Sequence, residues 1–176
     1  MSHLDFYKSI YDRELNRRKN LDDSISIPIG IISLLVGLIS FFYSNKDYKT
    51  IIIENYFILF LFGISIILMT LSIIFIIKSY NNFLRGFNYP NISYLKNIRK
   101  LQTQDIPNYN QIVTKEKEMN FEKELVDKLI GITDTNTKIN DTRAFDIYLA
   151  KTFIISSLSV LFITTIFLLI INSKLC

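Results

Sequence analysis

The stretch that decides the fold is YFILFLFGISIILMTLSIIFII, residues 56 to 77, which contains no charged side chain. A helix needs about 20 consecutive apolar residues to cross the hydrocarbon core of a bilayer. This run reaches that length, and its apolar side chains are continuous rather than confined to one helical face. We therefore expect it to form a transmembrane helix.

Two further runs have the same character: ISIPIGIISLLVGLISFFY, Ile25 to Tyr43, and TFIISSLSVLFITTIFLLII, Thr152 to Ile171. The alternative is three buried core helices, but the remaining, largely polar residues could not cover them. An apolar content of 49% with only 20% charged residues is also unusual for a soluble chain of this length. The sequence predicts an all-α integral membrane protein with three transmembrane helices. Pro28 is tolerated near a helix start, where its missing N–H costs little.

The predicted order of segments follows from these runs. Residues 1–24 should form an amphipathic cytoplasmic helix, because Leu4, Tyr7, Tyr11 and Leu15 fall on one face. Residues 25–80 should hold two transmembrane helices, at about 25–43 and 52–78, with a short outside loop. Residues 81–150 should be a cytoplasmic helical segment, and residues 151–176 the third transmembrane helix with a short outside tail.

Basic residues set the expected orientation, because short loops rich in Lys and Arg stay in the cytoplasm. Five of them precede the first run, whereas the 44–50 loop has only Lys46 and Lys49. We expect the N-terminus and the 81–150 segment inside and the C-terminus outside. Arg17, Arg18 and Lys19 should contact lipid headgroups. The net charge of +4 is explained by this topology, and direct nucleic-acid binding is not expected.

Within the cytoplasmic segment, Asn91 can cap a short helix over 91–104, and Pro107 should break the helical pattern. No proline lies between Pro107 and the third run. We therefore expect one helix from Lys115 to Ile171, roughly 85 Å long at 1.5 Å per residue, whose first half projects as a stalk. Gly131 is the expected point of bending.

A polar stripe lies where the stalk approaches the third run. Thr133, Asn136, Asn140 and Arg143 recur at steps of three, four and three, in register with the apolar Leu129. Buried polar groups without partners cost about 1–3 kcal/mol each, so these side chains would need partners in neighbouring helices or subunits. The alternative is a solvated helix face.

A stripe of small residues occupies one face of the first run: Gly30, Ser33, Gly37 and Ser40. Small residues let helix backbones approach closely in a bilayer. The partner is either another helix of the same chain, which we favour because three helices must pack, or a second copy. Glu54 should lie at the outer boundary, since a charge at the bilayer centre is costly. Its alternative role is an ion or proton site.

The sequence lacks the residues that most kinds of catalysis require. Cys176 is the only cysteine and His3 the only histidine, which excludes an internal disulfide and a cysteine metal site. No phosphate-binding loop or nucleophile–base pair is recognisable. We expect no enzyme activity, cofactor or metal.

Two motifs resemble a known class of proteins. The pattern YDREL.RR..L......P.G from Tyr11 to Gly30, followed by T.TN..IN..R from Thr133 to Arg143 directly before the last run, looks like small multi-spanning membrane proteins of bacterial antiphage defence loci. These include effectors linked to retrons or cyclic-oligonucleotide signalling and accessory proteins of some RNA-targeting CRISPR systems. The Arg-to-His ribonuclease motif of some relatives is absent here, since no histidine follows Arg143.

The resemblance implies a non-enzymatic effector in the bacterial inner membrane that homo-oligomerises and perturbs or permeabilises the membrane when activated. It also implies a cytoplasmic signal or partner from the defence system. The alternative is a structural or regulatory membrane subunit that anchors a cytoplasmic enzyme through the 81–150 segment.

Overall fold

The computed structural model describes residues 3–80 and 89–175, and within them the chain is helical with no strand. Three helical stretches contain an apolar window long enough to cross a membrane: His3–Ser44, Tyr56–Ser79 and Lys115–Ser173. The expected all-α fold with three such helices is therefore confirmed. The chain divides into two compact units, residues 1–20 with 86–141 and residues 21–85 with 142–176.

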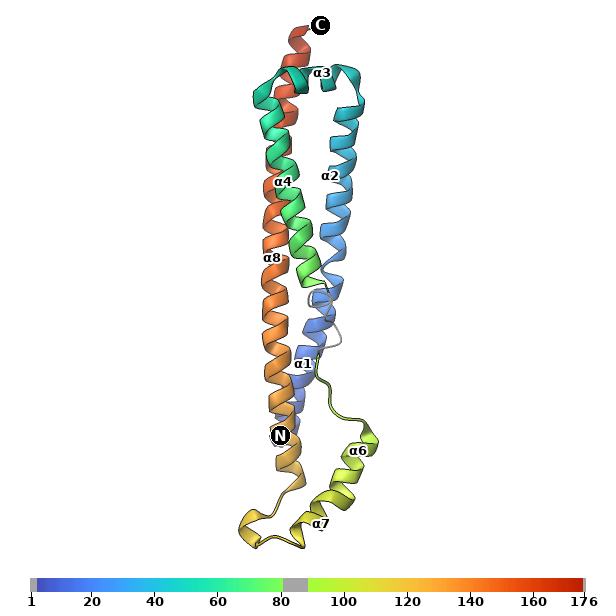
Figure 1. Cartoon of the computed structure of the whole chain (residues 1–176), viewed down its shortest axis with the longest axis vertical. Coiled ribbons are helices and arrows are strands. Elements are labelled where there is room, and N and C mark those ends of the chain that lie inside the picture. The colour runs from blue at the N-terminus through green and yellow to red at the C-terminus, as the bar shows by residue number, and fades with distance from the viewer. Residues whose placement is uncertain (1–2, 81–88, 176) are drawn as a thin grey trace. The chain divides into compact units, whose positions relative to one another are not determined.

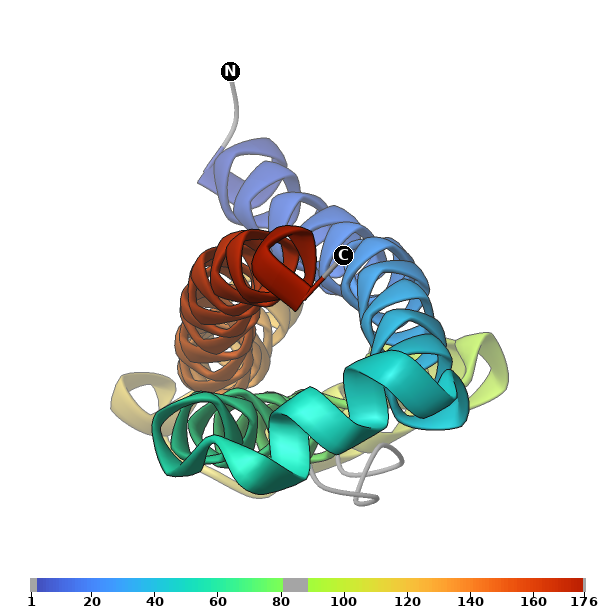
Figure 2. The same cartoon turned by 90° about the horizontal axis from the view of Figure 1, so that it is seen from above.

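The second unit contains the apolar helices. α2 (Ser26–Ser44) leads into the short α3 (Lys46–Glu54), which crosses to the start of α4 (Tyr56–Ser79) (Figures 1 and 2). The later part of α8 (Phe121–Leu175) runs along α4 in the opposite direction (Figure 1). All three long helices share a core that includes Leu35, Ile58 and Leu161.

The buried positions of these helices recur at alternating steps of three and four. This is the heptad period of helices that pack at a shallow left-handed angle, in membranes as in coiled coils. In α4 the buried residues are Ile58, Phe62, Ser65, Ser72, Ile76 and Ser79. In α8 the same period continues over Leu129, Thr133, Asn136, Asn140, Arg143, Ile147, Ala150, Ile154, Ser157, Leu161, Thr164 and Leu168.

The boundary between α3 and α4 differs from the expectation. The 44–50 stretch is not a simple loop, and the second apolar helix begins at Tyr56 rather than near residue 52. Asn55 interrupts the helix with extended backbone angles, and its side chain accepts hydrogen bonds from Phe57 N and Ile58 N. Such a cap satisfies the first free N–H groups of a helix. Glu54 consequently ends α3 and lies outside the apolar helix.

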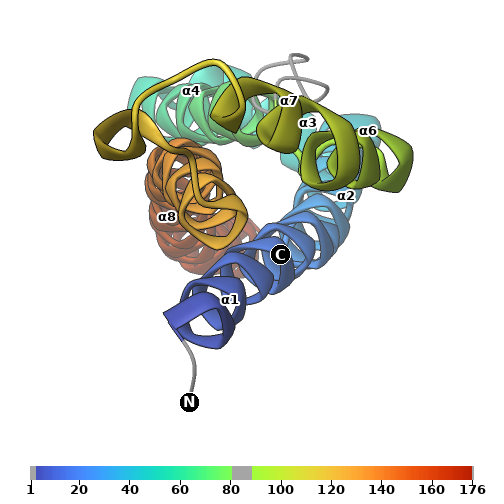
Figure 3. The same ribbon diagram turned by 90° about the horizontal axis from the view of Figure 1, so that it is seen from below.

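The first unit combines α1 (His3–Asp23, of which residues 3–20 belong here) with the start of α8 and a bent helical rod (Figure 3). The rod consists of α6 (Leu95–Lys100), a π-helical turn (Leu101–Asp105) and α7 (Ile106–Asn110). The expected cap at Asn91 and break at Pro107 are both wrong. Pro107 cannot donate to the carbonyl of Thr103, and the wider π turn accommodates it without ending the helix.

α8 begins later than expected, at Phe121 rather than Lys115. A separate 3-10 turn covers Lys115–Lys117, and Asn120 caps α8 by accepting hydrogen bonds from the N–H groups of Glu122 and Lys123. From there the helix continues to Leu175, and Gly131 lies within it. One helix therefore leads into and through the third apolar run, as expected, but only from residue 121 onward. That its first half projects as a stalk stays a prediction.

Candidate functional site

Asn140 is the centre of a buried polar cluster in the first unit. Its amide oxygen accepts a hydrogen bond from the hydroxyl of Tyr89 at 2.8 Å. Its amide nitrogen donates to the backbone carbonyl of Glu14 at 3.0 Å and to the Glu14 carboxylate at 3.1 Å. The asparagine is fully buried, so these bonds replace water entirely. One side chain of α8 thereby joins α1 to the segment around residue 89.

Glu14 supplies the negative charge of this cluster and is only 3% exposed. Arg13 and Arg17 lie 3.3 and 3.5 Å from its carboxylate oxygens, and Arg17 also bonds Asp141 at 2.6 Å. The hydrogen bond to Asp141 raises the pKa of Arg17 against the opposing effect of burial. A buried carboxylate needs such partners because removing it from water is costly. The sequence pattern placed Leu15, not Glu14, on the inner face.

Asn136 and Thr133 complete the buried polar face of α8 in this unit. The amide nitrogen of Asn136 donates to the carbonyl of Pro90 at 3.2 Å. Among the described residues, the amide oxygen of Asn136 and the hydroxyl of Thr133 have no hydrogen-bond partner. All four residues of the predicted stripe are buried, and the alternative of a solvated face is therefore wrong.

Arg143, the last residue of the stripe, belongs to the second unit. Its guanidinium group donates from Nε to the carbonyl of Ser79 at 2.8 Å and forms an ion pair with Asp22. In return the hydroxyl of Ser79 donates to the carbonyl of Arg143 at 3.1 Å. A cation is favourable here because Ser79 is the last residue of α4, where helix carbonyls carry partial negative charge. Arg143 is 1% exposed and ties α8 to the ends of two other helices.

A ladder of serines continues from Ser79 along α4 at steps of seven residues. Ser72 donates to the carbonyl of Ala150 at 3.0 Å. The hydroxyls of Ser65 and Ser157 lie 2.9 Å apart, and Ser157 also donates to the carbonyl of Ser65. Hydroxyls between apolar helices are hydrogen-bonded because hydrocarbon offers no water to replace the partner. The seven-residue spacing of Ser65, Ser72 and Ser79 is the sequence signal that could have identified this interface.

The stripe of small residues on α2 lies on the opposite face of that helix from the core. Gly30, Ser33, Gly37 and Ser40 are all exposed, whereas α2 buries Pro28, Ile32, Leu35 and Phe42. A Cβ atom added at Gly30 or Gly37 would meet no atom within 4 Å. The interpretation that this stripe packs against another helix of the same chain is wrong. A second copy as its partner stays a prediction.

The three basic residues assigned to lipid headgroups behave differently from one another. Arg17 is engaged with Glu14 and Asp141, and the guanidinium of Arg18 lies over the ring of Tyr89, 4.3 Å from its centroid. Both contacts lie within the first unit, and the expected headgroup role of these two arginines stays a prediction. Lys19 is exposed and still fits that role.

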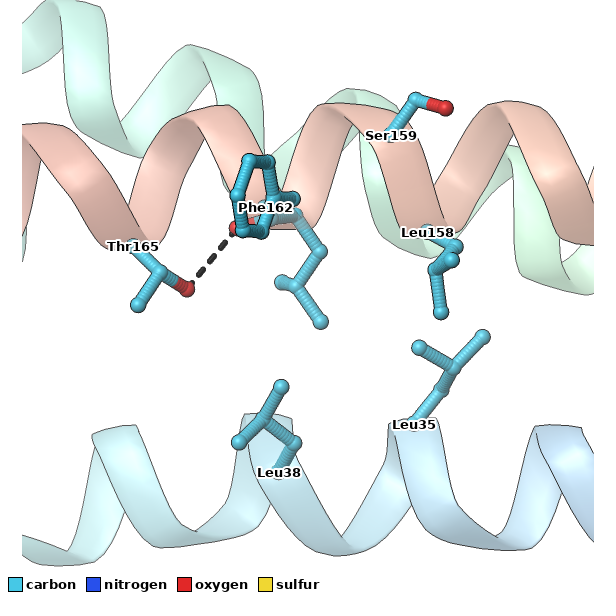
Figure 4. Close-up of a pocket in the computed structure, with 7 residues that line it drawn as sticks. Leu35, Leu38, Leu158, Ser159, Phe162 and Thr165 are labelled. Carbon is cyan, nitrogen blue, oxygen red and sulfur yellow. Dashed lines mark hydrogen bonds between the residues drawn. The ribbon is translucent and has the colours of Figure 1, made fainter.

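A groove of about 410 Å³ separates α2 from α8 in the second unit. Leu35 and Leu38 of α2 face Leu158 and Phe162 of α8 across it (Figure 4). The two hydroxyls on its wall, Ser159 and Thr165, donate to carbonyls of their own helix. The groove therefore offers only apolar contacts and no free polar group for recognition.

The described residues contain no group of three or more His, Cys, Asp or Glu side chains placed to hold a metal ion. No protein-family model matches the chain, and neither a curated protein nor a solved structure is significantly similar to it. The arrangement itself defines the class: the described residues are mainly helical, with three apolar helices, and the buried serines of α4 bond to α8.

Proposed function

We propose that this chain is a non-enzymatic effector of the bacterial inner membrane, acting in antiphage defence by assembling into a homo-oligomer that perturbs or permeabilises the membrane. The observation that carries this proposal is the outward small-residue face of α2. Such a face favours close helix association in a bilayer, and within one chain nothing packs on Gly30 or Gly37.

The hydrogen bonds of the second unit support assembly between copies as the source of a lesion. Ser65, Ser72 and Ser157 bond to each other or to backbone carbonyls inside the α4–α8 pair. Within one chain these three serines are therefore used between α4 and α8 and would not line a water-filled path. Ions would pass between copies, or after the α4–α8 pair rearranges. The resemblance of the Tyr11–Gly30 and Thr133–Arg143 patterns to defence proteins supports the biological setting.

The test is a membrane-potential measurement in bacteria that carry the gene and are challenged with a panel of phages. Cells with the parent chain should depolarise after infection by at least one phage and block its spread. Gly37→Leu should abolish depolarisation, because the leucine would hold two α2 helices apart. Gly63→Leu is the matched control, since a Cβ added at Gly63 in α4 also meets nothing within 4 Å.

Insertion of each variant is verified by membrane fractionation, so that loss of depolarisation cannot reflect loss of the protein. Full depolarisation by Gly37→Leu would remove the α2 face from the mechanism. Protection without any depolarisation by the parent would contradict a permeabilising effector.

A second function is favoured by exposed apolar side chains in the first unit. Tyr94, Leu95 and Ile112 are each 85% exposed, which suits a surface that a cytoplasmic partner covers. The chain would then anchor or regulate that partner. The parent chain and its partner should form a complex of fixed size in detergent. The double variant Tyr94→Ser with Leu95→Ser should cause this complex to dissociate. If the same double variant still protects cells from phage, the anchoring function is excluded.

A further inference from the structure

An apolar pocket of about 420 Å³ lies in the second unit and is lined by residues of α2, α3 and α4. The short α3 crosses from α2 to α4 (Figure 2). The pocket walls include Ile39, Tyr43 and Ser44 of α2, Ile53 of α3, and Leu59 and Ile66 of α4. The volume is within the range of about 300–1,000 Å³ that is typical of ligand sites. Because α2 and α4 are candidate membrane helices, the surrounding medium would be hydrocarbon.

The charges of α3 are separated around its axis. Lys46, Lys49 and the pocket-lining Ile53 follow one another at steps of three and four, so they share one stripe of the helix. Asp47 and Glu54 fall on a different stripe, which contributes no residue to the pocket wall. The stripe of α3 that contains the pocket-lining Ile53 therefore carries both lysines, although α3 as a whole has two positive and two negative side chains.

Lys49 lies beside the pocket, because its nitrogen is 4.8 Å from the ring centroid of Tyr43, which is part of the pocket wall. A cation over an aromatic face is stabilised without losing its ability to donate hydrogen bonds. Among the described residues, neither Lys46 nor Lys49 forms an ion pair with a carboxylate. Lys49 thus lies beside a pocket-lining tyrosine, Lys46 shares its stripe of α3, and neither has a carboxylate counter-ion among the described residues.

We propose that this pocket binds one anionic phospholipid, with an acyl chain between α2 and α4 and the phosphate against Lys49 and Lys46. The apolar wall selects hydrocarbon, and the lysines select a headgroup with net negative charge over a zwitterionic one. Exposed tyrosines beside the site, Tyr43 and Tyr56, are the side chains that membrane interfaces favour. The groove between α2 and α8 is lined by those two helices alone, with no residue of the lysine-bearing α3, and should show no such preference.

The proposal requires membrane insertion but does not rest on the effector function, so the two can fail separately. The test uses the full chain in nanodiscs that contain phosphatidylcholine and phosphatidylglycerol, with bromine on the acyl chains of one lipid at a time. The sequence has no tryptophan, so Ile66→Trp supplies a single fluorescent reporter in the pocket wall. Leu158→Trp reports on the α2–α8 groove as the matched control.

At Ile66→Trp, brominated phosphatidylglycerol should reach half-maximal quenching at a mole fraction about 30-fold lower than brominated phosphatidylcholine, the affinity change expected from two lysines near an anionic headgroup. Lys46→Gln with Lys49→Gln should bring the two lipids to equal quenching, and Lys46→Arg with Lys49→Arg should keep the preference. At Leu158→Trp both lipids should quench equally.

Equal quenching of the parent pocket reporter by both lipids would overturn the proposal, as would a preference that survives the double glutamine variant. The same preference for phosphatidylglycerol at Leu158→Trp would also overturn the proposal, because the selectivity would then belong to the whole lipid-facing surface of the protein. Native mass spectrometry of the chain without tryptophan provides a second readout. It should find retained phosphatidylglycerol on the parent and lose it in the double glutamine variant.

Discussion

Asn140 shows how a single buried amide can unite three segments of the chain. Its amide oxygen accepts a bond from Tyr89, and its nitrogen donates to the carboxylate and backbone carbonyl of Glu14. An apolar residue of similar size would fill the space but leave a buried carboxylate with one donor fewer. Removing one partner of a buried pair exposes the full desolvation cost of the other.

Asn140→Leu should therefore lower the free energy of unfolding by about 1–3 kcal/mol, measured by denaturant titration of the purified chain in detergent. The matched control is Asn16→Leu on the exposed side of α1, which should change it by about 0.5 kcal/mol or less. The double variant Glu14→Leu with Asn140→Leu should lose less than the sum of the two single changes, because neither partner is then left alone. Strict additivity would contradict the coupling.

At the scale of elements, the pairing of α4 with α8 depends on repetition. Ser65, Ser72 and Ser79 occupy equivalent positions in three successive heptads, opposite Ser157, Ala150 and Arg143 on the antiparallel helix. The small residues permit close approach, and each hydroxyl has a partner in the other helix. In a bilayer, apolar burial would add little between the two helices, and these contacts would then contribute a large share of the specificity.

Ser72→Ala should weaken the helix pair by about 0.6 kcal/mol, and by about 1.7 kcal/mol at most, because it removes the bond to the carbonyl of Ala150. Ser159→Ala is the matched control, since that hydroxyl bonds to Ile155 of its own helix. Unfolding in mixed micelles provides the comparison. Equal losses in the two variants would show that the inter-helix bond contributes nothing beyond the local one.

At the scale of the whole molecule, the expected topology assigns the two flanks of the apolar helices to opposite sides of the membrane. The 81–150 segment carries ten Lys and Arg residues, whereas the 44–50 stretch has two. This asymmetry predicts that α3 lies outside and that the turn after α7 lies in the cytoplasm. Orientation can be measured independently of any activity.

In a Cys176→Ser background, Thr50→Cys should react with a membrane-impermeant maleimide in intact cells, and Gln111→Cys should react only after lysis. Both positions are exposed, so a difference in labelling reports sidedness rather than burial. The reverse pattern would invert the topology, and labelling of both positions in intact cells would contradict three membrane crossings.

The sequence by itself determined where the three apolar helices lie and that Thr133, Asn136, Asn140 and Arg143 share one face of α8. Both are local properties: a long uncharged run specifies a helix able to cross lipid, and a step of three or four specifies a common face. Local reasoning failed at Pro107 and Asn55. The helix continues through Pro107 because a π turn precedes it, and the apolar helix starts only after Asn55 because the side chain of Asn55 caps it.

Only the tertiary structure decided which residues form hydrogen bonds and ion pairs with the polar face of α8. Tyr89 and Glu14 lie 51 and 126 residues from Asn140 along the chain, and Asp22 lies 121 residues from Arg143. No spacing rule connects positions so far apart, since folding of the backbone brings them together. The same holds for α2, which is uncharged on every face. Only packing against α4 and α8 turned its large residues inward and its small ones outward.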